Sequence, residues 1–90
     1  MPKYMIERDF PGAGQLKPEE FQAIAKKSCD VLKAMGPEIQ WVESYVSADK
    51  VYCVYIAKDE AAIRTHGALG GFPMSRVSQI VSVMDPTSAE

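Results

Sequence analysis

The sequence predicts an α+β fold of the ferredoxin-like type, a βαββαβ sandwich in which two helices cover one face of a four-stranded antiparallel sheet. Three observations lead to this prediction. The chain has 90 residues, which is room for one core and a single domain spanning residues 1–90. Its hydrophobic periodicity changes between strand-like and helix-like segments. These segments follow the order strand, helix, strand, strand, helix, strand, and right-handed crossovers then place both helices on the same face.

The first third of the chain predicts a strand and a long helix. Residues Lys3–Phe10 alternate in the manner of a strand, and Pro11–Gly14 ends it. The residues predicted to face the core are Tyr4, Ile6 and Phe10, and those on the other face are Met5, Glu7 and Asp9. A helix is predicted to begin at Pro18, because proline is favoured at the first helical position and two acidic residues follow it. Apolar residues at helical spacing continue to Met35, and Gly36-Pro37 predicts the end of the helix.

A hairpin is predicted next. Two runs dense in β-branched and aromatic residues, Ile39–Ser47 and Lys50–Ala57, are joined by Ala48-Asp49. A two-residue turn would place Trp41, Glu43, Tyr45, Tyr52, Val54 and Ile56 on one face. The same turn would place Val42, Ser44, Val46, Val51, Cys53 and Tyr55 on the face toward the helices. A slip of one residue would reverse half of this assignment.

The last part of the chain predicts a short helix and a final strand. Asp59 is a suitable N-cap for a helix that carries Ile63 and His66 on one stripe and ends at Gly70-Gly71. The final strand is predicted over Arg76–Met84, which is rich in Val and Ile.

The face of the sheet away from the helices is predicted to be covered by a second copy of the chain. Both helices lie on the opposite face, so this face would leave Trp41, Tyr45 and their apolar neighbours in water. Burying apolar surface is worth about 25 cal/mol per Å², which makes such exposure unfavourable. Sheet-to-sheet association into a homodimer of the dimeric α/β-barrel type covers them most simply. A monomer is the competing prediction.

Composition excludes several classes of function. A net charge of −2 and a pI near 5.4 leave little basic surface for nucleic acid. The charged residues in Met1–Phe10 are unlike a signal peptide or a membrane span, so we expect no membrane partner and a cytoplasmic location. Cys29 and Cys53 form no Cys-x-x-Cys pattern, and in a reducing compartment both are expected to be free thiols.

His66 is the only histidine and the first candidate for chemistry. On an apolar helix stripe it would point toward the sheet, where it could be a buried residue bonded to backbone or to a tyrosine. Imidazole also changes charge near neutral pH and is a frequent ligand of Ni, Cu and Zn. A metal ligand and a general base therefore remain open alternatives.

Three further residues are candidates for metal binding. Glu43 lies mid-strand among apolar residues, where a carboxylate usually needs a partner, and Glu7 is predicted on the same open face. Cys53 would face the helices near His66. The alternatives are a solvated or ion-paired carboxylate for Glu43 and a buried apolar thiol for Cys53.

Five segments resemble a family of small bacterial proteins that has a nickel-binding or nickel-responsive branch. They are PKYMIERDFPGAG, KKSCDVLKAMGPEIQWVESYV, DKVYCVYIA, GGFP and MDPTSAE, and together they span nearly the whole chain. The resemblance implies a dimeric ferredoxin-like sandwich and a role with a transition metal. In relatives we expect a histidine at the position of Glu43, so this chain departs from the pattern there.

The leading hypothesis is a cytoplasmic, non-enzymatic homodimer in which His66, assisted by Glu43, Glu7 and Cys53, holds Ni²⁺ or a similar divalent ion. The alternative is a small dimeric α/β-barrel enzyme or ligand-binding protein that acts on an apolar or aromatic molecule, with His66 as general base. A cavity beside His66 would favour this alternative. A third possibility is an interaction module whose open face binds a different protein.

Overall fold

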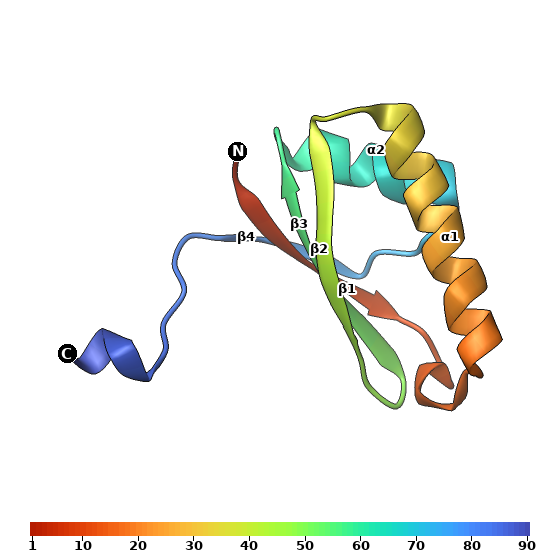
Figure 1. Cartoon of the computed structure of the whole chain (residues 1–90), viewed down its shortest axis with the longest axis horizontal. Coiled ribbons are helices and arrows are strands. Elements are labelled where there is room, and N and C mark those ends of the chain that lie inside the picture. Colours follow the sequence, from red (N-terminus) through yellow and green to blue (C-terminus); the bar gives the residue numbers. More distant parts are fainter.

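The computed structural model describes residues 1–90 and contains four strands, two α-helices and two short 3-10 helices. In chain order these are β1 (Lys3–Asp9), η1 (Ala13–Gln15), α1 (Pro18–Met35), β2 (Ile39–Val46), β3 (Lys50–Ala57), α2 (Glu60–Gly70), β4 (Arg76–Ile80) and η2 (Pro86–Ala89). The strands form one antiparallel sheet in the order β2-β3-β1-β4. Figure 1 shows α1 and α2 on the same side of this sheet. The predicted ferredoxin-like α+β fold is confirmed.

Both helices begin and end where the sequence predicts. Pro18 is the first residue of α1, and the Lys17 N–H donates to Glu20 Oε1 at 3.0 Å, which caps one of the free amides at the helix start. Gly36 ends α1 with a φ of +83°, a value that favours glycine. The Asp59 carboxylate accepts a hydrogen bond from the Ala62 N–H at 2.9 Å and caps α2. Neither helix combines the length and apolar character that crossing a membrane requires.

The core lies between α2, the second half of α1 and the centre of the sheet. Its buried members are Tyr4, Ile6, Ile39, Cys53, Tyr55, Ala57 and Ile63. Leu32 and Met35 of α1 pack against this cluster. The predicted core face of β1 is therefore confirmed for Tyr4 and Ile6.

The first half of α1 does not close onto the sheet in the same way. Phe21 and Ile24 lie on the predicted apolar stripe, yet each remains 37% exposed. The only fully buried residue of the helix is Ser28, near its middle. The sandwich is thus well packed at one end and open at the other, which creates the cavity described below.

A β-bulge in β2 corrects part of the predicted face assignment. Trp41 pairs with Tyr55 and Glu43 pairs with Val54, so Val42 is an extra residue without a partner. Trp41 therefore lies on the helix face together with Tyr55, and its predicted position on the open face is wrong. Val42 is the exposed bulge residue and was wrongly expected to face the helices. Beyond the bulge the predicted alternation holds, and Glu43 is on the open face.

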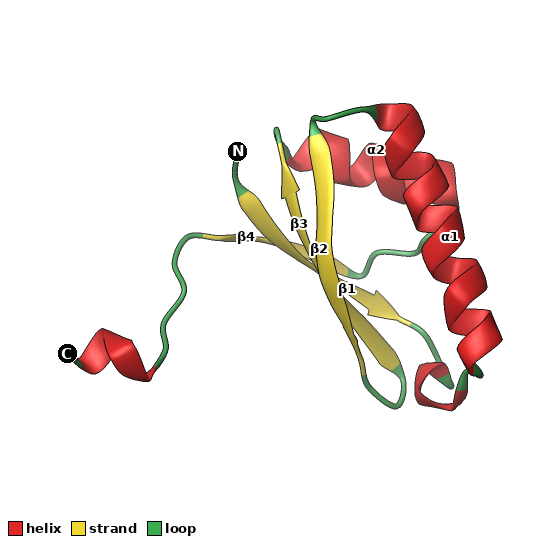
Figure 2. Cartoon of the chain, in the orientation of Figure 1, coloured by secondary structure: helices red, strands yellow, loops and turns green.

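The last strand is shorter than predicted. β4 ends at Ile80, where it pairs with Lys3, the first residue of β1. The chain beyond Ile80 has no neighbouring strand to pair with, so the predicted extension to Met84 is wrong. Val81, Val83 and Met84 are 70–90% exposed. Figures 1 and 2 show this C-terminal segment, residues 81–90, reaching away from the sheet on the side opposite the helices.

Candidate functional site

His66 lies in the interior between α2 and the sheet. It follows Ile63 by three residues on α2, and both side chains point inward because residues at this spacing share a helix face. No part of the His66 side chain is exposed. Its ring lies 5.2 Å from the Tyr55 ring and 5.4 Å from the Phe72 ring, measured between centroids. The position predicted from the helix stripe is confirmed.

One ring nitrogen of His66 contacts two hydroxyl groups. Nε2 lies 3.1 Å from the Tyr55 hydroxyl on β3 and 3.3 Å from Ser28 Oγ on α1. These bonds link α2, the sheet and α1 at the point where the sandwich begins to open. The other nitrogen, Nδ1, is buried without a hydrogen-bond partner, which is uncommon for a buried polar atom.

Burial keeps His66 neutral at physiological pH. The loss of water around the ring, reinforced by the positive charge of Arg8, lowers the pKa of His66 from 6.5 to about 4. Burial also raises the pKa of Tyr55, and a hydrogen bond from Ser28 opposes that rise. The Ser28, Tyr55 and His66 groups thus form an uncharged, polar cluster inside the protein.

The four predicted metal ligands lie on two sides of the sheet. Cys53 is buried on the helix face, as is His66. Glu43 pairs with Val54 and Glu7 pairs with Tyr52, which places both carboxylates on the open face. Within one chain, no three His, Cys, Asp or Glu side chains come close enough together to hold a metal ion.

The two carboxylates on the open face, Glu43 and Glu7, have only weak partners within the chain. The Tyr45 hydroxyl donates to the Glu43 carboxylate, and this bond together with the negative charge of Glu43 raises the pKa of Tyr45. Glu7 is 3.9 Å from both Lys50 Nζ and Arg76 Nε. Ion pairs of this length at a surface contribute little to stability, so the Glu7 carboxylate remains available to another partner, and Glu43 takes part in no ion pair.

Arg8 is the buried residue that sequence reasoning missed. Its Nη1 donates to the backbone carbonyls of Pro73 at 3.1 Å and Phe72 at 3.4 Å, and only 6% of the residue is exposed. Its guanidinium also lies 5.6 Å from the centre of the Phe72 ring. The available signal was strand alternation, because Arg8 follows Ile6 by two residues and therefore shares its face.

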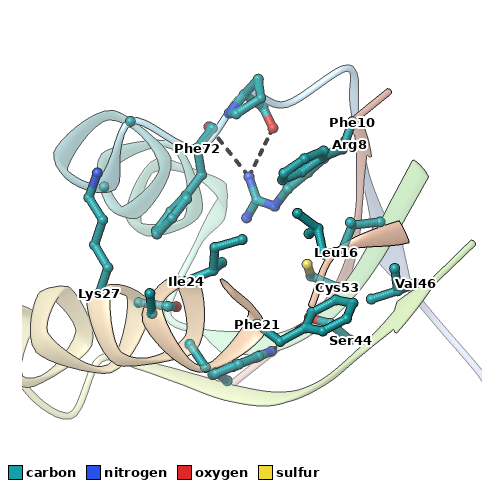
Figure 3. A pocket seen from close by; sticks show the side chains of 18 of the residues that line it. Arg8, Phe10, Leu16, Phe21, Ile24, Lys27, Ser44, Val46, Cys53 and Phe72 are labelled. Carbon is teal, nitrogen blue, oxygen red and sulfur yellow. Dashed lines mark hydrogen bonds between the residues drawn. The ribbon is translucent and has the colours of Figure 1, made fainter. Parts of the chain in front are cut away.

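A cavity of about 620 Å³ lies between the sheet and the first half of α1, and it opens to solvent. Twelve of its nineteen lining residues are hydrophobic. Arg8, Ser28 and Tyr55 line the deeper part, next to His66. Figure 3 shows the Arg8 guanidinium between Phe72 on one side and Leu16 and Cys53 on the other.

The comparison with solved structures supports the fold. The chain is similar to a structure described as "Crystal structure analysis of SCO4226 from Streptomyces coelicolor A3(2)", with a TM-score of 0.76 and 9% sequence identity. The match covers 91% of this chain and 99% of that chain. No curated protein matches the sequence significantly.

The family comparison covers most of the chain. Residues 4–80 match the family described as "Nickel responsive protein SCO4226-like". The matched range runs from the first residues of β1 to the end of β4 and includes every helix and strand that surrounds the cavity and the open face. The chain therefore belongs to the SCO4226-like family of nickel responsive proteins.

Proposed function

We propose that this protein binds a divalent transition metal, with Ni²⁺ as the first candidate, as a homodimer joined through its open sheet face. Membership of a family named for its response to nickel is the observation that carries this proposal. The family name indicates the metal, and the chain's own residues indicate where two copies would meet.

An uncovered apolar surface supports the dimer. The open face carries Tyr45, Tyr52, Val54 and Ile56 from the hairpin and Met5 and Ile80 from the neighbouring strands. The C-terminal segment, which carries the exposed Val81, Val83 and Met84, runs off on the same side (Figure 1). Apolar residues gathered in this way are costly to leave in water, and a second copy would bury them.

The carboxylates of the open face are the donors that fit such an interface. Glu43 projects there from β2 and Glu7 from β1, with β3 between them, and a two-fold axis would bring a second pair opposite them. Carboxylate oxygen is a harder donor than imidazole, and it suits Ni²⁺ less well. His66 and Cys53 lie behind the sheet, so the proposed ion does not contact them.

Equilibrium dialysis with nickel, copper and zinc tests the metal site. We expect Glu43→Gln and Glu7→Gln to weaken binding, whereas Glu38→Gln, at an exposed carboxylate before β2, should not. His66→Gln should also leave binding unchanged. No binding by the unmodified protein would end the proposal, and a loss caused by His66→Gln alone would move the ion to the interior.

Light scattering on matched lysine variants tests the dimer separately. Tyr45 on the open face and Leu69 on α2 are exposed to a similar degree, at 53% and 61%. We expect Tyr45→Lys to give a monomer and Leu69→Lys to remain a dimer. A monomeric unmodified protein, or a Tyr45→Lys protein that stays dimeric, would contradict the proposed interface.

The cavity favours the second interpretation, a small-molecule protein, but the geometry argues against His66 as its general base. A general base works best when its pKa is near the operating pH, and the pKa of His66 is about 4. The ring is also fully buried behind Ser28 and Tyr55, which themselves line the cavity. The cavity is therefore better suited to binding than to proton abstraction by this residue.

A further inference from the structure

The cavity between α1 and the sheet has the size and lining of a small-molecule site. Its volume of about 620 Å³ lies within the range of about 300–1,000 Å³ typical of ligand pockets. The outer part is apolar, with Leu16, Phe21 and Val46 around it, and the inner part is polar. It lies on the opposite side of the sheet from Glu43 and Glu7, so it is independent of the proposed metal site.

The charge of the lining is entirely positive. Arg8 and Lys27 are the only charged residues among those that line the cavity, and no carboxylate accompanies them. Arg8 is only 6% exposed. It takes part in none of the ion pairs of the protein. A buried guanidinium usually has an anionic partner, and this one has only uncharged neighbours: two backbone carbonyls, the Tyr55 hydroxyl and an aromatic ring.

Arg8 keeps donors free for such a partner. A guanidinium carries five N–H groups. The hydrogen bonds of Arg8 to backbone carbonyls use Nη1 alone, and the Tyr55 hydroxyl interacts with a further N–H. At least two N–H groups therefore remain available, and the fork geometry of a guanidinium matches a carboxylate. Figure 3 shows the group reaching into the cavity from β1.

The hydroxyl groups of Ser28 and Tyr55 lie beside Arg8 and add polar character to the inner part of the cavity. Nε2 of His66 contacts both Ser28 Oγ and the Tyr55 hydroxyl, but one ring nitrogen offers either a single lone pair or a single N–H. It cannot take the protons of both hydroxyls. Ser28 also hydrogen-bonds to Tyr55, so the second O–H either closes this network or, with a ligand bound, turns toward an oxygen in the cavity, which both residues line.

We propose that this cavity binds a small organic anion with an apolar body, an aryl or alkyl carboxylate, whose carboxylate pairs with Arg8 and whose apolar part lies beside Phe21 and Leu16. The anion supplies the charge that the buried Arg8 lacks. Lys27, 5.7 Å from the Phe72 ring, adds a second positive charge at the same end of the cavity.

Two probes that differ only in charge test this assignment. Binding of 4-phenylbutanoate and 4-phenylbutan-1-ol is measured by calorimetry and by the fluorescence of Trp41, which lines the cavity and is the only tryptophan. A charge-assisted hydrogen bond is worth about twice a neutral one, so we expect the carboxylate to bind at least about tenfold more tightly. Arg8→Gln should remove about tenfold of the carboxylate affinity and leave the alcohol unchanged.

Matched variants separate the cavity from general charge effects. Arg64→Gln removes the same charge from the exposed face of α2 and should leave binding unchanged. If Arg8→Gln fails to fold, Lys27→Glu decides the question against Lys26→Glu, because only Lys27 lines the cavity. We expect about a threefold loss for Lys27→Glu and none for Lys26→Glu.

Three results would overturn the proposal. The first is equal affinity for the two probes or no binding at millimolar concentration. The second is unchanged carboxylate binding in a folded Arg8→Gln protein, or in Lys27→Glu when Arg8→Gln does not fold. The third is binding that dissociates the protein into monomers, which would assign the cavity to a second copy of the chain.

Discussion

Acid should destabilise the fold through His66, and the size of the effect follows from its pKa. Protonation of the buried ring is disfavoured, with a pKa of about 4 in the folded protein against 6.5 for the exposed group. The unfolded chain therefore binds more protons between these values, so stability is full above pH 6.5 and falls as the pH decreases. Linkage predicts a loss of about 2 kcal/mol between pH 7 and pH 5 and about 3 kcal/mol by pH 4.

A variant without the titrating ring isolates this contribution. His66→Gln places a neutral group near Tyr55 and Ser28 that can hydrogen-bond but takes up no proton in this range. The free energy of unfolding is measured by urea denaturation from pH 7 to pH 4 for both proteins. Carboxylates titrate in each of them, so their contribution cancels in the difference.

We expect the unmodified protein to lose stability more steeply with acid. Between pH 7 and pH 4 its free energy of unfolding should fall by about 3 kcal/mol more than that of His66→Gln. Parallel pH profiles for the two proteins would refute the reasoning. They would mean that the ring is solvated in the folded state.

Four other substitutions test packing and helix ends by the same urea assay. Asp59→Ala removes the bond to the Ala62 N–H and should cost about 1 kcal/mol; an unchanged midpoint would contradict the cap. Ile63→Ala leaves a cavity at a residue that is 1% exposed and should cost about 3 kcal/mol, whereas Ile24→Ala, 37% exposed, should cost less than half as much. Equal losses would contradict the open end of the sandwich. Gly71→Ala forces a side chain into φ of +67° and should cost about 1 kcal/mol, and a stabilised variant would contradict that strain.

The elements were predictable where local signals and tertiary structure agree. Pro18 and Gly36 bracket α1 by their own backbone preferences, and Asp59 caps α2 through its side chain. The hairpin follows from two β-rich runs around a two-residue turn. Each of these features depends on a few neighbouring residues, which is the information that a sequence displays directly.

The errors arose where a distant partner decides the structure. Residues 81–84 have strand composition, but β1 begins at Lys3 and offers them nothing to pair with. The bulge at Val42 depends on β3 opposite it, and the composition of β2 does not reveal it. The strand alternation places Arg8 on the core face, but a charged residue is usually expected to be exposed. The carbonyls that accept its hydrogen bonds lie more than sixty residues away in the chain, so the sequence does not show them.

The candidate site was only partly predictable for the same reason. The direction of His66 follows from the spacing of α2, and its contact with Tyr55 agrees with the predicted face of β3. Ser28 follows the helical spacing of α1, but its contact with His66 could not be foreseen, because that contact depends on how α1 crosses the sheet. The cavity is equally a product of tertiary structure, since the same apolar stripe in α1 would have closed it had the helix packed along its whole length.

The bulge at Val42 also determines what the single tryptophan can report. It turns Trp41 away from the open face and into the cavity, where its Nε1 donates to Ser44 Oγ at 2.9 Å. Dimerisation through the open face should therefore leave the Trp41 emission unchanged on dilution, whereas 4-phenylbutanoate should shift it. Light scattering on the same samples monitors dissociation of the dimer. A shift in Trp41 emission that accompanies dissociation would mean that two copies meet at the cavity. The outcome thus separates the two surfaces of the sheet with one fluorophore that the protein already contains.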